Sequence, residues 1–338
     1  MKIAIQSKFG FGYTAGPKAV NDATSILKRE GWKIYYVNKI RCDYPKIPAL
    51  FGAFADILRL LLVFCNLNKK ADVLIQWPVF SNYLSVKMLL IILRLRKTSY
   101  TVLIHDIQNL RLELSERDKV FEQYVKGSYH VIVHSPNMEK YLRSLGIETK
   151  TSILTSFDYL TTDVIPSRFR SNVVTFVGNL VKSEFLIDID DSFLQGWDLY
   201  CYGVGGDKIP KCITYKGCFE PEKVSVIEGS WGLVWDGTSK DTCNGVMGRY
   251  LRYNAPHKLS LYIVSGLPLI VWQESSLAEF VKKNNLGVTI KSLNEIGYTI
   301  TSISDEEYLE YCVNVKNEAE RLKRGEHLIN CINGNNNI

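Results

Sequence analysis

The chain has 338 residues, of which 46% are hydrophobic and 22% charged, so it has the composition of an ordinary soluble globular protein and the length for two domains. The net charge is +6, but residues 1–160 hold 23 Lys and Arg against 13 Asp and Glu, while the remainder holds 18 against 22. A basic amino-terminal half indicates an anionic partner or membrane surface. The sequence has no basic run interleaved with aromatic residues, which argues against nucleic acid.

Apolar strand-like runs alternate with helical patterns along the whole chain. In the first half, strands are predicted at 2–7, 32–38, 72–77, 99–106 and 130–135, with helices near 17–30, 50–66, 81–95, 116–127 and from 136. In the second half, strands are predicted at 173–178, 197–203, 212–217, 231–236, 267–272 and 288–290, with helices near 221–229, 256–265, 275–284 and 305–330. Val- and Ile-rich strands separated by helices are typical of parallel sheets covered on both faces.

This pattern predicts an α/β protein with two Rossmann-like domains whose parallel sheets face a central cleft. We expect domains at 1–160 and 173–305, followed by a terminal helix and tail at 306–338. The polar segment 161–172, which contains Pro166, is the predicted linker.

The sequence also bears on location. The segment 1–8 lacks the apolar core of a signal peptide, and the apolar stretches 51–65 and 83–95 are too short and too charged to span a bilayer. Each is expected to be a buried helix or, as the alternative, a helix at the membrane interface. Eight cysteines without a CxxC pair indicate free thiols in a reducing cytosol. We therefore expect a cytoplasmic protein, with peripheral contact at the inner face of the plasma membrane as an open alternative.

The segment 250–260 is the most informative motif. It follows the strand 231–236, and Pro256 stands where a helix would begin, because Pro is favoured in a first helical turn. The free amides of that turn, together with His257 and Lys258, form a predicted anion site suited to a nucleotide diphosphate. An ordinary capped helix with a solvated lysine is the alternative.

Three further segments carry candidate chemistry. The first strand runs into a loop with Gly10, Gly12 and Gly16, whose GxGxxxG spacing does not match an NAD fingerprint, so the loop is a flexible turn or a contact to sugar or phosphate across the cleft. His105 and Asp106 end a buried strand. Asp106 is a candidate general base with His105 beside it, or else a cap of the following loop.

The second half repeats the strand-then-glycine design at 177–182. Lys182 is predicted to face the same edge as Lys258, where two lysines would stabilise a departing diphosphate without a metal. Asp236 ends the strand 231–236 and is expected to line the site. The acidic run 188–191 contains a DxD, but it lies far from Pro256 and is interpreted as solvated surface; no metal site is predicted, and His130 with His134 lacks a completing ligand.

At this point the residues resemble a known family, the bacterial two-domain glycosyltransferases of the GT-B type. Within it they are most similar to β-galactofuranosyltransferases of O-antigen assembly and to the glucosyltransferase that extends GlcNAc on serine-rich adhesins. The matching segments run nearly end to end, and the block 231–262 is the specific part; they are 103–107, 110–111, 134–142, 157–160, 177–180, 231–237, 242–245 and 253–262.

The resemblance implies that UDP binds mainly to the carboxyl-terminal domain. Lys182 and the segment Tyr253, Asn254, His257 and Lys258 would contact the nucleotide, with Gly16 approaching from the other domain. It also implies metal-independent transfer, no cofactor other than the UDP-sugar substrate, and self-association as a homo-oligomer. Two departures are small, because Lys182 stands where Arg is frequent and Ala255 where Asn is common, and neither removes a charge.

We therefore expect a hexosyltransferase that moves a sugar from UDP to a saccharide acceptor. The second domain would hold the donor, with Tyr202 bordering the base, and the first domain would hold the acceptor near Gly12–Gly16 and His105–Asp106. The favoured donor is UDP-galactofuranose in surface polysaccharide biosynthesis on a lipid-linked acceptor, and the alternative is UDP-glucose with GlcNAc of a glycoprotein. Asp106 is the expected base if the anomeric centre inverts and an acceptor ligand if it is retained. A sugar-nucleotide epimerase and a catalytically silent nucleotide-binding partner remain open.

Overall fold

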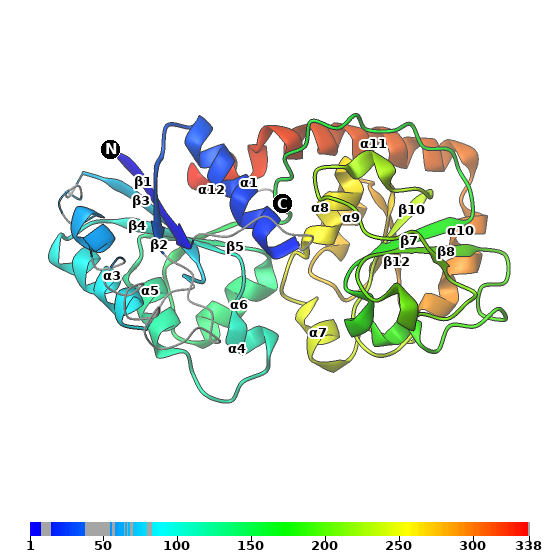
Figure 1. Ribbon diagram of the computed structural model, residues 1–338, viewed down its shortest axis with the longest axis horizontal. Helices are drawn as coiled ribbons and strands as arrows, with labels where there is room; N and C mark the ends of the chain where they lie inside the picture. Colours follow the sequence, from blue (N-terminus) through cyan, green and yellow to red (C-terminus); the bar gives the residue numbers. More distant parts are fainter. Residues whose placement is uncertain are drawn as a thin grey trace.

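The computed structural model describes residues 1–7, 15–37, 55, 58–63, 65, 67, 70–79 and 83–336, without the side chains of 15 and 16. Two sheets of six parallel strands organise these residues (Figure 1), and this confirms the predicted α/β class. The glycines at positions 10 and 12, which the sequence proposed as ligand contacts, lie outside the described residues.

The first sheet has the strand order β2-β1-β3-β4-β5-β6, and all its neighbours pair in parallel. Strands β1 and β3 are buried after their exposed first residue and β5 is buried throughout, as a sheet covered on both faces requires. The elements of this domain are β1 (Lys2–Ser7), α1 (Ala15–Arg29), β2 (Lys33–Val37), β3 (Asp72–Trp77), α3 (Tyr83–Leu95), β4 (Tyr100–Ile104), α4 (Gln108–Arg111), α5 (Lys119–Gly127), β5 (His130–Val133), α6 (Pro136–Ser144) and β6 (Lys150–Ile153).

The second sheet has the order β12-β11-β10-β7-β8-β9, again parallel throughout. Its core is rich in large side chains, and Trp231, Trp235 and Trp272 are almost completely buried. The elements are β7 (Val173–Val177), η1 (Leu180–Lys182), β8 (Asp198–Tyr202), β9 (Thr214–Tyr215), β10 (Trp231–Val234), α7 (Gly245–Tyr250), α8 (His257–Val264), β11 (Leu269–Trp272), α9 (Ala278–Lys283), β12 (Gly287–Ile290) and α10 (Ile296–Ser302).

The carboxyl terminus connects the two domains, as Figure 1 shows. The helix α11 (Asp305–Arg324) packs on α8 of the second domain, and α12 (Glu326–Ile332) returns to α1 and β6 of the first. The predicted single helix at 305–330 is therefore wrong. Gly325 breaks it with a left-handed φ of 81°, a conformation that glycine adopts without strain, and a Cβ there would lie 2.7 Å from Ile26.

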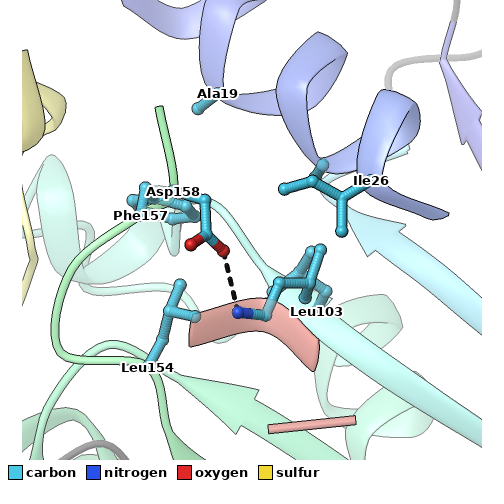
Figure 2. A pocket seen from close by; sticks show the side chains of 8 residues that line it. Ala19, Ile26, Leu103, Leu154, Phe157 and Asp158 are labelled. Atoms are coloured by element: carbon cyan, nitrogen blue, oxygen red, sulfur yellow. Dashed lines mark hydrogen bonds between the residues drawn. The ribbon is translucent and has the colours of Figure 1, made fainter. Parts of the chain in front are cut away.

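Asp158 holds the start of α12 against the first domain. Its carboxylate accepts hydrogen bonds from the amides of His327 and Leu328 at 3.1 and 2.8 Å. Figure 2 shows Asp158 among apolar side chains around a cavity of about 10 Å³, which has room for one water at most. Burial raises the pKa of this carboxyl to about 6.

Other local predictions need correction. The segment 221–229 forms only a short 3-10 turn at Val224–Val226 instead of a helix. The strand β6 and the helices α7 and α10 were not predicted. The helix α7 presents Arg249 and Tyr250 to the first domain.

Candidate active site at the domain interface

The segment 249–255 docks onto the first domain at the carboxyl ends of β4 and β5. The Ser135 hydroxyl donates to the carbonyl of Tyr253 at 2.6 Å, and the Asn137 amide donates to the carbonyl of residue 252 at 2.9 Å. Ser135 is oriented for this contact because it also caps α6, where it accepts from the amide of Met138. The segment predicted to hold the nucleotide is thus also the junction between the domains.

His134 adds a second link across this junction. Its Nε2 lies 2.8 Å from the carbonyl of Ile104, and its Nδ1 accepts from the amide of Ala255 at 3.2 Å. Because the carbonyl can only accept, the network assigns the proton to Nε2. Burial lowers the pKa of His134 to about 4, so the ring is neutral at pH 7 and keeps both bonds. Its role at the junction was not predicted from the sequence, where His134 and His130 formed an incomplete metal site.

Asp106 is held from both domains. Its Oδ2 pairs with Arg111 at 2.6 Å, and its Oδ1 accepts from the Tyr250 hydroxyl at 2.7 Å. The Tyr250 oxygen also accepts from the amide of Ile107 at 3.3 Å. Burial first, and the Asp106 charge second, raise the pKa of Tyr250 well above its ordinary value, so the hydroxyl stays protonated. The Asp106 side chain is 18% exposed and so keeps a face toward solvent.

His105 lies beside Asp106 on a polar network within the sheet. Its Nε2 lies 2.7 Å from Oε1 of Gln76, whose amide donates to Gln6, and the Thr24 hydroxyl joins the network from α1. Its ring stacks on Phe157 with centroids 5.3 Å apart. Burial lowers the pKa of His105 to about 3, so the imidazole is neutral, donates from Nε2 and leaves Nδ1 as an acceptor. That Nδ1 is buried and has no partner among the described residues.

The Lys258 side chain lies at the carboxyl end of β10 in the second sheet. Its Nζ donates to the carbonyl of Trp235 at 3.0 Å, lies 3.9 Å from Asp236 and sits 4.5 Å above the ring of Phe176. The side chain is only 15% exposed. Pro256 is the N-cap of α8 rather than its first residue, and no side chain caps that turn. Lys258 is thus the second residue of a helix whose first turn has no side-chain cap.

The predicted partner of Lys258 is placed differently. Lys182 is exposed at the end of η1 and makes no ion pair with a described residue. Beside the Lys258 ammonium, the backbones of Gly178 and Gly203 come so close that a Cβ at 203 would lie 1.7 Å from the carbonyl oxygen of Gly178. The structure thus shows a glycine-lined edge next to Lys258, but it does not bring the two ammonium groups into contact.

Other predicted site residues serve packing in this structure. Tyr202 is buried, and its hydroxyl donates to the carbonyl of Val226 and accepts from the amide of Glu228, so it has no face toward a base. His257 points away from the Lys258 edge and stacks on Tyr159 at 4.9 Å. Burial lowers the pKa of His257 to about 3, and its buried Nε2 has no partner among the described residues.

The remaining predicted residues lie near the junction. Asn254 accepts at its carbonyl from the Ser276 hydroxyl at 2.6 Å, while its side-chain oxygen is buried without a partner in the described part of the chain. Gly16 lies in the first turn of α1.

Within the described residues, no three His, Cys, Asp or Glu side chains are arranged to hold a metal ion. None of the described helices is long and apolar enough to cross a membrane.

Comparison with known families matches both halves of the chain. Residues 2–156 match the family described as Glucosyltransferase 3-like, N-terminal domain, and residues 174–334 match Glucosyltransferase 3-like, C-terminal domain. The chain belongs to the glucosyltransferase 3-like family. As a member of this family it is a glycosyltransferase, which sets aside the epimerase and the silent partner.

Two curated relatives are similar to this glucosyltransferase 3-like chain over most of its length. The chain is 29% identical over 330 residues to the β-1,6-galactofuranosyltransferase WbbI of Escherichia coli K12, covering 93% of this chain and 92% of WbbI. It is 24% identical over 265 residues to glucosyltransferase 3 of Streptococcus parasanguinis, covering 75% of this chain and 74% of that protein. Both were anticipated by the resemblance read from the sequence.

Solved structures show that this glucosyltransferase 3-like chain has the GT-B fold. An α-glucosyltransferase in complex with UDP and a 13-mer DNA aligns with a TM-score of 0.60 at 13% identity, over 98% of this chain and 97% of that one. The apo structure of OtsA aligns with a TM-score of 0.59 at 10% identity, over 98% and 99% of the two chains. At these identities the likeness concerns the fold alone.

Proposed function

We propose that this glycosyltransferase transfers a hexose from a UDP-sugar to a saccharide acceptor at the domain junction. The observation that carries the proposal is the position of Lys258. Its ammonium is fixed by the Trp235 carbonyl beside the uncapped first turn of α8, and the same stretch of chain delivers Tyr250 to Asp106. A cation and free amides on one side, and a carboxylate on the other, are the groups that sugar transfer needs.

In this proposal Lys258 and the α8 amides bind the diphosphate and stabilise the negative charge that UDP acquires when its bond to the anomeric carbon breaks. The acceptor hydroxyl attacks that carbon, and Asp106 takes its proton if the configuration inverts. Tyr250 and Arg111 hold the Asp106 carboxylate in place, and each carboxylate oxygen retains a lone pair for the acceptor. If the configuration is retained, Asp106 orients the acceptor instead.

The favoured donor is UDP-galactofuranose, because the relative that matches 93% of the chain is a galactofuranosyltransferase. UDP-glucose is the second candidate, because the glucosyltransferase 3 of S. parasanguinis matches 75% of the chain. The proposed setting is surface polysaccharide assembly on a lipid-linked acceptor at the cytoplasmic face of the membrane. In its support, α3 exposes the apolar residues Leu84, Ile91 and Leu95 with Lys87 and Arg94.

The test is a donor screen. The protein is incubated with UDP-galactofuranose, UDP-glucose, UDP-galactose and UDP-GlcNAc in turn, without added acceptor, and slow hydrolysis to UDP is followed together with saturation-transfer NMR of each sugar ring. The proposal predicts that UDP-galactofuranose gives the strongest saturation and the fastest hydrolysis. A preference for UDP-glucose would move the assignment to the second candidate, and saturation of no UDP-sugar would contradict the proposal.

A further inference from the structure

The helix α3 presents one exposed and largely apolar face to solvent. Tyr83, Leu84, Ile91 and Leu95 are each more than half exposed. They form a single stripe, because residues three, four, seven and eight positions apart lie on the same side of an α-helix. The other side of α3 is buried, with Ser85, Val86, Leu89, Leu90, Ile92 and Leu93. In Figure 1 this helix lies at the end of the first domain that is farthest from the second domain.

The helical segment 58–63 exposes a second set of apolar side chains. Leu58, Leu61 and Leu62 are 48% to 59% exposed, while Leu60 and Val63 are buried. The buried side chains of this segment and of α3 belong to one core cluster, and residues of β1 and β3 alternate between this cluster and a separate one on the opposite face of the sheet. Both helical segments therefore cover the same face of the first sheet. Single exposed apolar residues are ordinary, but seven on two segments over one face indicate a binding surface.

The charged residues in this part of the chain are almost all basic. Residues 57–105 contain one acidic residue, Asp72, and seven basic ones, which are Arg59, Lys69, Lys70, Lys87, Arg94, Arg96 and Lys97. Lys87 and Arg94 are exposed within the α3 stripe itself. The Lys87 ammonium lies 4.3 Å from the centroid of the Tyr83 ring, so a cation and an aromatic ring are presented together. The surface is both apolar and cationic, and it fits a partner that is apolar and anionic.

A membrane with anionic lipids has both properties. Lys and Arg can lay their aliphatic stems along apolar surface while the charged groups reach phosphate and water, and Tyr is enriched at the interface between lipid and water. An anionic leaflet attracts each basic residue close to it, and α3 itself contains no acidic residue that would oppose this attraction. Protein interfaces, in contrast, are depleted in Lys. The composition of the stripe therefore favours a lipid surface over a protein partner.

We propose that the surface formed by α3 and the segment 58–63 docks the protein on a membrane that contains anionic lipids. None of the described helices is long and apolar enough to cross a bilayer, so α3 lies along the membrane surface. The inference rests on the proposed function for its lipid-linked acceptor and deepens it by naming the surface that meets the membrane. Docking itself requires neither UDP nor a sugar.

The test is co-sedimentation of the full chain with two kinds of vesicle at physiological and at high salt. One kind is phosphatidylcholine alone, and the other is phosphatidylcholine mixed with phosphatidylglycerol. The double variant Ile91→Gln/Leu95→Gln removes apolar side chains from the stripe, and Lys87→Gln/Arg94→Gln removes its two cations. All four side chains are exposed and Gln is compatible with a helix, so both variants should fold.

A matched control makes the same change elsewhere in the chain. Leu309 and Val313 are 57% and 58% exposed on α11 and have the spacing of Ile91 and Leu95. The control variant is Leu309→Gln/Val313→Gln. Titration with UDP, thermal unfolding and sedimentation velocity without vesicles are recorded for every protein, so that nucleotide binding, folding and self-association are each measured separately from docking.

We expect the wild type and the control to bind mixed vesicles alike, and to bind phosphatidylcholine alone about tenfold more weakly. Loss of the two cations should weaken binding to mixed vesicles roughly 25-fold, because each basic residue near an anionic surface contributes roughly fivefold. Loss of the two apolar side chains should weaken it about tenfold or more, and high salt should weaken binding of the wild type.

Two results would overturn the inference. One is that the wild type does not bind mixed vesicles, or that both α3 variants bind them as tightly as the control does. The other is a wild-type oligomer that dissociates in Ile91→Gln/Leu95→Gln without any vesicle binding, which would assign the surface to a second copy of the chain. Absence of UDP binding by the wild type would count against the proposed function alone, because docking does not depend on the nucleotide.

Discussion

Removal of the Tyr250 hydroxyl should destabilise the protein through one identifiable contact. In Tyr250→Phe, Asp106 loses a hydrogen bond of 2.7 Å and the amide of Ile107 loses its acceptor, while the ring remains in place. A hydrogen bond to a charged group contributes about 1.5 to 3 kcal/mol. With an unfolding entropy of about 2.1 cal/mol/K per residue, a loss of about 2 kcal/mol in this 338-residue chain lowers Tm by roughly 3 °C.

The assay is calorimetric unfolding of the wild type, Tyr250→Phe, Asp106→Ala and the double variant. Because Tyr250 and Asp106 are in direct contact, the Tyr250→Phe loss should shrink in the Asp106→Ala background. Arg249→Met is the matched control, since it removes an exposed pair with Glu113 across the same junction and should have a much smaller effect. If Tyr250→Phe unfolds at the wild-type temperature, or if its effect is the same with and without Asp106, the Tyr250–Asp106 bond does not hold the domains.

Three other variants test separate parts of the structure. Burial lowers the pKa of His327, but the bond to Glu318 outweighs burial and holds this pKa above its ordinary value. Protonated His327 therefore stabilises the fold fully below about pH 6.5, the pKa of the unfolded state. This stabilisation is lost as pH rises through the higher pKa of the folded state. The difference in Tm between the wild type and His327→Gln should therefore shrink from pH 6 to pH 9, and a constant difference would contradict this. Gly203→Ala should prevent folding, because its Cβ would overlap the Gly178 carbonyl. The control Gly196→Ala has a positive φ but open space around it, so it should lower the free energy of unfolding by only about 1 kcal/mol. Similar yields of folded protein for the two variants would contradict the close approach of Gly178 and Gly203. Asp106→Asn should abolish transfer while preserving UDP affinity, and wild-type turnover would remove Asp106 from the mechanism.

The sequence predicted the sheets well because their signal is local. The buried strands contain apolar runs, for example 73–75 and 231–234, that are read directly from the residues. The break at Gly325 was missed because the helical pattern continues on both sides of it. Only the return of α12 to the first domain, with Gly325 against Ile26, shows why the glycine is there.

The site was predicted in part for the same reason. Asp106 and Lys258 were found because Asp106 comes just after the clear strand β4 and Lys258 lies in the first turn of the clear helix α8. Tyr250, Ser135 and Asn137 were not singled out, because their partners lie more than 100 residues away in the chain. Tyr202 was assigned to the site from its place at the end of β8, where the direction of its side chain, and hence its burial, is not visible in the sequence.

Calorimetric titration of UDP tests the central claim most directly, with Lys258→Met compared against the wild type and against Lys282→Met, an exposed lysine on α9 of the same domain. If the Lys258 ammonium and the first turn of α8 bind the diphosphate, loss of one charge-assisted contact should raise Kd about tenfold or more in Lys258→Met and leave Lys282→Met unchanged. Equal UDP affinity in all three proteins would contradict the account.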